Sequence, residues 1–166
     1  MADSYERRCI DELIARFENA MTGGSESLTD VNGLGARKLN GVFRDPQGGD
    51  ELEAPPFAVF QTHLEDSGDY LNLRQFSKHK PLVIGIWDSC DVEKDALADS
   101  LVADIVRIAS RRTDGIEDLS LNGLAVLLKF IHGRKRISKA NGDFVGAECR
   151  FDIQYRHAVG NPRSLL

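Results

Sequence analysis

Residues 149–156 (CRFDIQYR) alternate between apolar or aromatic side chains at odd positions and polar or charged side chains at even positions. This period of two predicts a strand with one buried face and one face turned to water or to a partner. The outer face carries Arg150, Asp152 and Arg156, which are charges of both signs. A plain sheet edge needs no such mixture, so the pattern favours a surface that meets a partner.

Residues 5–21 predict an amphipathic helix. Apolar residues recur there three or four positions apart, which gathers them on one face of a helix. Asp3 or Ser4 is suited to cap its start, and Gly23-Gly24 stops it.

A second helix is predicted further along the chain. Its start is marked by a capping Asp88 or Ser89, and Asp91 and Glu93 place negative charge in the first turn, where it interacts favourably with the helix dipole. It ends near Arg111, whose positive charge suits the opposite end of the dipole. Its apolar stripe consists of Leu97, Leu101, Ile105 and Ile108.

Four more segments have the composition of strands, namely 36–44, 57–62, 81–87 and 124–132. The first contains Gly41, which predicts a bulge, and the second begins directly after Pro55-Pro56, which must lie outside the ladder. Residues 81–87 (PLVIGIW) are apolar at both parities, so we expect this strand in the middle of the sheet, buried on both faces.

Two polar segments connect these strands. Residues 63–80 predict a loop or an irregular hairpin, and residues 133–143 predict a loop whose Asn141-Gly142 pair is a strong hairpin-turn signal. The order α–β–β–β–α–β–β predicts a single domain, 1–166, with an α+β fold of two layers. We expect a mostly antiparallel sheet of about five strands with both helices on one face. The other face is left to loops, water or a neighbouring subunit.

Composition limits the classes of function. The 166 residues are 42% hydrophobic and 28% charged, which is ordinary for a globular protein. The net charge of −5 disfavours nucleic-acid binding over the whole surface but allows a local basic patch. The N-terminal segment lacks the apolar stretch of a signal peptide, and the longest apolar run, LAVLLKFI, is too short for a membrane span. We therefore expect a soluble protein made in the cytoplasm.

Neither the histidines nor the cysteines have the spacing of a catalytic or metal site. The four histidines form no HxH or HExxH pattern, and Cys9, Cys90 and Cys149 are too far apart for a CxxC pair. The glycines of NGLGARKLNG precede a strand and do not join a strand to a helix, as a phosphate-binding loop does. We expect no enzyme, no cofactor and no metal. The remaining enzyme hypothesis is a nucleophilic Cys90 at the start of the second helix, where the dipole lowers a thiol pKa.

The densest charge in the sequence is basic, with Arg134, Lys135 and Arg136 in a row and Lys139 shortly after them. Two interpretations stay open, namely a solvated hairpin loop and a cationic finger that contacts nucleic acid or an acidic partner. The cations are not interleaved with aromatic residues, which argues against stacking on single strands. An acidic cluster in an earlier loop consists of Asp50, Glu51 and Glu53.

Taken together, these elements resemble the tail-terminator, or tail-completion, proteins of long-tailed phages, which are minor tail proteins. The resemblance rests on the N-terminal helix, on GVFRDP leading through a polar loop to PPFAVF, on PLVIGIWD followed by a long helix, and on the closing RFDIQYRHAVGNP. It covers most of the chain and is one of pattern and element order. The ending departs from the Gly-Asp-Pro close of such chains by carrying Asn161 before Pro162.

The resemblance implies a six-fold ring of copies in the virion, at the head-proximal end of the tail tube. Such a ring stops tube polymerisation and joins the head connector, while DNA passes through its lumen without sequence recognition. The implied partners are further copies of the chain, the tail tube protein and the connector, with no membrane and no cofactor. Subunit or partner contacts are assigned to Arg134, Lys135, Arg136, Lys139, Asp50, Glu51, Glu53, Arg150, Asp152 and Arg156. The alternatives are a nucleic-acid-binding accessory protein that uses the basic hairpin, and another component of the phage neck.

Overall fold

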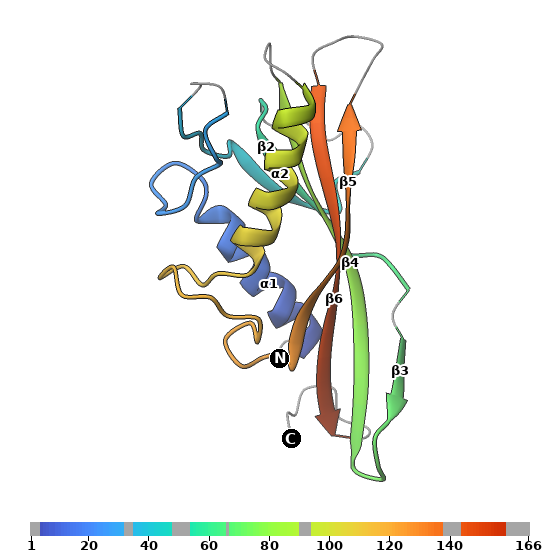
Figure 1. Ribbon diagram of the computed structural model, residues 1–166. Coiled ribbons are helices and arrows are strands. Elements are labelled where there is room, and N and C mark those ends of the chain that lie inside the picture. The colour runs from blue at the N-terminus through green and yellow to red at the C-terminus, as the bar shows by residue number, and fades with distance from the viewer. Residues whose placement is uncertain are drawn as a thin grey trace.

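The computed structural model describes residues 4–31, 35–47, 54–65, 67–89, 94–137 and 144–158. These residues form two helices, α1 (Tyr5–Glu18) and α2 (Lys94–Ala109), and six strands. The strands are β1 (Gly41–Arg44), β2 (Phe57–Gln61), β3 (Ser67–Tyr70), β4 (Gln75–Ser89), β5 (Leu127–Ile137) and β6 (Phe144–Ala158). Both helices lie on the same side of one twisted sheet (Figure 1). The predicted α+β fold with a mostly antiparallel sheet is confirmed.

The sheet has the order β1-β2-β4-β6-β5, and β3 pairs with the part of β4 that β2 does not reach. Among these pairs only β1 and β2 run parallel. β4 and β6 pair over their whole length, from Gln75 opposite Ala158 to Ser89 opposite Phe144. Figure 1 shows these two strands running from one end of the molecule to the other, so they form the frame on which the remaining elements are placed.

The helices cover one side of the sheet because each carries one apolar stripe. At the start of α1, the Ser4 side chain accepts a hydrogen bond from the Arg7 backbone N–H (3.3 Å), as predicted for a cap. Phe17 of α1 is buried and meets Phe60 of β2 edge to face, with ring centroids 5.2 Å apart. The predicted stripe of α2 is also buried, and it consists of Leu97, Leu101, Ile105 and Ile108.

The strand predicted over 81–87 is confirmed in the middle of the sheet, between β2 and β6. Its buried side chains on the helix side are those of Leu82, Ile84 and Ile86. On the other side Val83 and Trp87 are only half-buried, so the prediction that both faces are buried is wrong. The strand is longer than predicted and begins at Gln75, because β3 and β6 provide backbone partners for its polar first half. The segment predicted as a loop or irregular hairpin is thus a hairpin of β3 and β4.

The two residues predicted to cap the second helix lie at the end of β4. Ser89 is its last residue, and Asp88 is buried, where its carboxylate forms an ion pair with Arg37 and accepts the backbone N–H of Ser89 (2.8 Å). In the described residues the helix begins at Lys94, with Asp95 as the acidic residue of its first turn. The predicted first-turn acids at positions 91 and 93 lie outside the described residues.

Two predicted strands have different bounds. The segment 36–44 becomes a strand only at Gly41, because residues 37 and 39 make isolated bridges with the segment that follows α1. The segment 124–132 becomes a strand only at Leu127, since positive φ angles at residues 121–123 make the chain turn there. From Leu127 the strand runs on to Ile137, so the prediction of a loop is wrong for residues 133–137. The rest of that loop lies outside the described residues.

Candidate interaction surfaces

The side of the sheet turned away from α1 and α2 is here called the open face. The predicted alternation along β6 decides which residues face it. Cys149, Phe151, Ile153 and Tyr155 are buried on the helix side. Arg150 and Arg156 are exposed on the open face, and Asp152 is half-buried there. The predicted pattern of one dry and one wet side is therefore confirmed.

The basic run lies on strand β5 and not in a loop, and a β-bulge decides where its side chains point. Phe130 is opposite Phe151 and His132 is opposite Arg150, which leaves Ile131 without a partner in the ladder. One extra residue moves every later side chain of a strand to the other face. Without it, the arginines of β5 would face the helices.

The bulge places Arg134 and Arg136 on the open face. Arg134 lies opposite Glu148, and both guanidinium groups approach the same Glu148 carboxylate, with N–O distances of 3.5 Å from Arg134 and 3.3 Å from Arg136. Arg150 joins them from the neighbouring strand, opposite His132. The structure therefore brings together three of the predicted contact residues around one acidic side chain.

Lys135 lies on the opposite side of the strand. Its ammonium group contacts the carboxylates of Asp99 (3.2 Å) and Asp95 (3.7 Å) on α2. The hydrogen bond and charge of Asp99, with a further contribution from Asp95, raise the pKa of Lys135. This lysine serves to attach β5 to α2, so the predicted basic cluster is divided between two faces.

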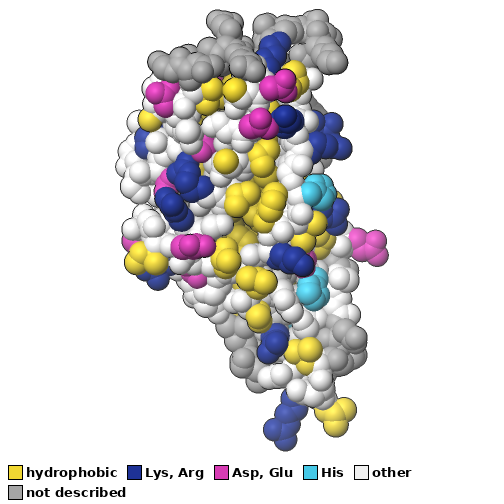
Figure 2. Space-filling view, in the orientation of Figure 1, with side chains coloured by type: hydrophobic (Ala, Val, Ile, Leu, Met, Phe, Trp, Pro, Cys, Tyr) yellow, Lys and Arg dark blue, Asp and Glu magenta, His cyan; other side chains and the backbone are white. Residues whose placement is uncertain are grey.

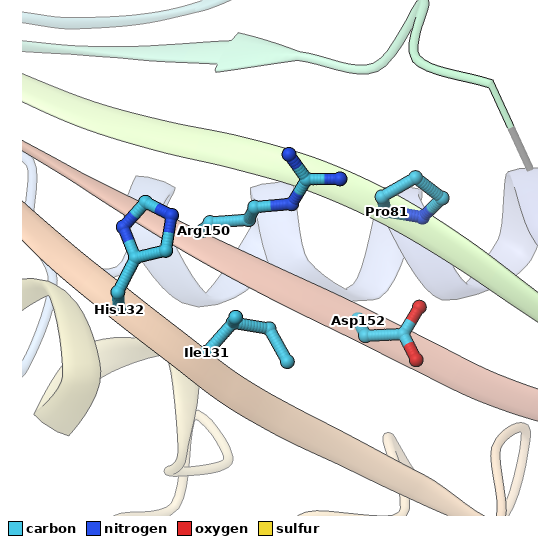
Figure 3. A pocket seen from close by; sticks show the side chains of 5 residues that line it. All are labelled: Pro81, Ile131, His132, Arg150 and Asp152. Atoms are coloured by element: carbon cyan, nitrogen blue, oxygen red, sulfur yellow. The ribbon is translucent and has the colours of Figure 1, made fainter.

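Two adjoining hollows mark the open face. One, of about 270 Å³, is lined by Gln61, Val83, His132, Arg134, Arg136, Glu148 and Arg150. The other, of about 400 Å³, is lined by Pro81, Ile131, His132, Arg150 and Asp152. Figure 3 shows these five side chains with the helices behind the strands, so they lie on the side away from the helical layer. Asp152 is also in contact with His79, whose Nδ1 lies 2.7 Å from its carboxylate.

The β5 edge is a second candidate surface, because β5 is the last strand of the sheet order. From Lys129 to Arg136 every residue of it is exposed, including the large apolar Phe130 (41%) and Ile131 (44%). Figure 2 shows hydrophobic side chains gathered along the middle of the molecule, where α2 and β5 lie side by side. A long, exposed edge strand with apolar side chains has unpaired backbone groups that can form hydrogen bonds with another chain.

The β1 edge, at the other end of the sheet order, has a hollow of its own. It has a volume of about 410 Å³ and is lined by Glu18, Met21, Asn40, Gly41, Val42 and Phe43. These residues come from the end of α1, the segment after it and β1. Sequence reasoning missed this hollow, since nothing in the sequence signals that these segments meet.

The remaining predicted contact residues lie elsewhere. Arg156 is on the open face near the end of β6, opposite Ser77. The other four predicted contact residues lie outside the described residues, so their role stays a prediction; they are Lys139, Asp50, Glu51 and Glu53.

The described residues contain no group of three or more His, Cys, Asp or Glu side chains that could hold a metal ion. Cys9 and Cys149 are buried free thiols, and burial raises the pKa of each to about 12, with small opposing effects of Arg8 and Glu6 on Cys9. Such thiols are poor nucleophiles. Cys90 lies outside the described residues, so the hypothesis that it is catalytic stays a prediction. Neither helix of the described ranges has the length and hydropathy to cross a membrane.

No protein-family model matches the chain. No curated protein matches it either. The resemblance to tail terminators therefore stays a prediction.

Proposed function

We propose that this chain is a structural protein that assembles with copies of itself into a ring on the head-proximal end of a phage tail tube. The ring stops polymerisation of the tube and provides the surface that joins the head connector. The observation that supports this most is the complementarity of the two sheet edges. The resemblance of element order to tail terminators adds to it.

The two edges differ in shape and charge. The β5 edge presents Phe130 and Ile131, with the bulge turning Ile131 out of the ladder, and Lys129 stands beside them. The hollow at the β1 edge is lined by apolar side chains and by the exposed carboxylate of Glu18. When two copies meet head to tail, the apolar side chains of the β5 edge face the apolar hollow of the β1 edge. Lys129 of one copy then lies near Glu18 of the next.

A contact between two different surfaces repeats from copy to copy and forms a ring when the rotation closes. The contact is weak by itself. Complete burial of a large apolar side chain contributes about 1.5–3 kcal/mol, so burying the exposed part of Phe130 and Ile131, each somewhat under half, contributes about 1 kcal/mol apiece. We therefore expect rings at high protein concentration or on a tube, and monomers in dilute solution.

Light scattering at rising concentration, with negative-stain images of the same fractions, tests the ring. Ile131→Asp should shift the midpoint of assembly upward by at least tenfold, because it places a charge in the apolar contact. Ile116→Asp is the matched control, since Ile116 is also an exposed isoleucine (55%) but belongs to the loop after α2. Equal effects of the two variants would contradict the edge contact.

The pairing of the edges is tested by charge reversal. Lys129→Glu and Glu18→Lys should each weaken assembly, and the double variant should restore it, because the two reversed charges again have opposite signs. Assembly that the double variant fails to restore speaks against this pairing.

The tail function requires a separate assay with purified tail tubes. Rings that cap the tubes and stop their growth support a terminator. Rings that leave the tubes growing exclude it and favour another ring of the phage neck.

A further inference from the structure

We infer that the open face of the sheet binds the phosphate backbone of nucleic acid, without recognition of its sequence. This surface adjoins the β5 edge, with which it shares Lys129 and Ile131, but its arginines take no part in the proposed edge contact. The inference therefore holds for a single copy of the chain as well as for a ring.

Charge is distributed unevenly over the molecule. The chain has a net charge of −5. On β4, β5 and β6, by contrast, five cations and two carboxylates share the open face, an excess of three positive charges. The cations are Lys129, Arg134, Arg136, Arg150 and Arg156, and the carboxylates are Glu148 and Asp152. A local positive patch can attract a polyanion even when the protein as a whole is acidic.

The two carboxylates of this face compensate only part of the charge of its arginines. Glu148 is shared between two guanidinium groups, and Asp152 is already in contact with His79. Arg150 forms no ion pair within the described part of the chain and lines both hollows. Arg150 and at least one of the two arginines on β5 thus have donors left for an anion.

The spacing of the cations suits a chain of phosphates. Arg134 and Arg136 are two residues apart on one strand, which places their backbones roughly 7 Å apart. Arg150 is on the adjacent strand, two residues along from the position opposite Arg134, and its backbone is therefore roughly 8 Å from that of Arg134. Arginine binds phosphate through two parallel N–H donors. Among the residues that line the hollows there is no Phe, Tyr or Trp, so stacking of bases has no support and backbone contacts remain.

Fluorescence anisotropy of a labelled 20-base-pair DNA duplex, titrated with the full chain at 50 and 200 mM salt, measures the contact. Each neutralised phosphate adds about −0.9 to the slope of log K against log salt. With three arginines engaged, the affinity should fall about 40-fold between the two salt concentrations, and for Arg150→Gln it should fall about 12-fold.

Lys135→Gln is the matched control. It removes one positive charge from β5, the strand of Arg134 and Arg136, but from the side that faces α2. We expect the affinity and the salt dependence of this variant to equal those of the unaltered chain. If it weakens binding as much as Arg150→Gln does, net charge and not the open face governs the interaction, and the inference is wrong.

Two further results decide between partners. Failure of the unaltered chain to bind the duplex at 50 mM salt overturns the inference, as does displacement of the duplex by polyglutamate at equal charge concentration, which would assign the face to an acidic protein. Binding that persists in Glu18→Lys, which alters the β1 edge and not the open face, supports the inference independently of ring formation. Circular dichroism melting curves confirm that each variant is folded.

Discussion

Arg16 connects three separate parts of the fold, and its replacement is the sharpest test of how the helical layer is held together. The side chain lies in α1 and is 1% exposed. One terminal nitrogen donates to the carbonyl oxygens of Ala109 (2.8 Å) and Asp118 (2.7 Å), and the other donates to the Asp118 carboxylate (3.0 Å). Its Nε donates to Glu12 one turn earlier (3.0 Å). Since Ala109 is the last residue of α2, Arg16 joins both helices to the loop that leads to β5.

Arg16→Met keeps a long apolar stem but removes all of these donors. Removing one partner of a buried ion pair costs about 3–5 kcal/mol, because the other charge is left without compensation. We expect the lower end, about 3 kcal/mol, since Asp118 keeps hydrogen bonds from Ser120 and Asn122. For a domain of this size each kcal/mol lowers the melting temperature by about 2–4 °C, so the loss should be about 6–12 °C.

Calorimetry or a denaturant titration of the unaltered chain and the variant measures this loss. Arg112→Met is the matched control, because Arg112 also pairs with an aspartate, Asp114, but at an exposed site. Surface pairs of this kind contribute about 0–1 kcal/mol. The reasoning is refuted if Arg16→Met costs no more than Arg112→Met.

Three further outcomes are expected. Burial by itself would raise the pKa of Asp118, but hydrogen bonds from neighbouring groups and the charge of Arg16 outweigh it and lower the pKa to about 2. The ionised Asp118 carboxylate therefore stabilises the folded chain fully above about pH 4, and this contribution is lost as the pH falls through about 2. The free energy of unfolding should drop by about 2 kcal/mol over that range. The drop should be absent in Asp118→Asn. The buried thiols of Cys9 and Cys149 should react with iodoacetamide at pH 8 only at the rate of unfolding, and fast labelling of the native chain would contradict their burial. Gly133→Ala should cost about 1–3 kcal/mol in chemical denaturation, because its Cβ would lie 2.8 Å from a Val102 methyl group; a neutral result would mean that α2 yields easily.

Much of the layer architecture could be predicted from periodicity. The apolar stripes of both helices, the central position of 81–87 and the two faces of β6 are all local patterns that burial of apolar surface makes decisive. The bounds of strands were harder to predict. The polar residues from Gln75 onward form a strand only because β3 and β6 supply backbone partners, and those pairings are not visible in the local sequence.

The candidate surfaces were predictable only in part. The sequence indicated a cluster of cations at Arg134, Lys135 and Arg136, but it predicted them in a hairpin loop and gave no sign that they would be divided between two faces. The β5 edge and the β1 hollow depend on which strands end the sheet and on what lies beside them. Those facts follow from pairing between segments far apart in the chain, which no local pattern encodes.

By itself, the sequence of this protein determined its two helices and their buried stripes, the centre of the sheet at residues 81–87, the two faces of β6 and the excess of basic residues before the last strand. The direction of those basic side chains was decided by the tertiary structure. The extra residue Ile131 in β5 has no partner in β6, and because side chains alternate along a strand, it moves Arg134 and Arg136 to the open face and Lys135 to α2. A bulge exists only relative to a paired strand. The surface that we assign to nucleic acid therefore depends on the pairing of β5 with β6.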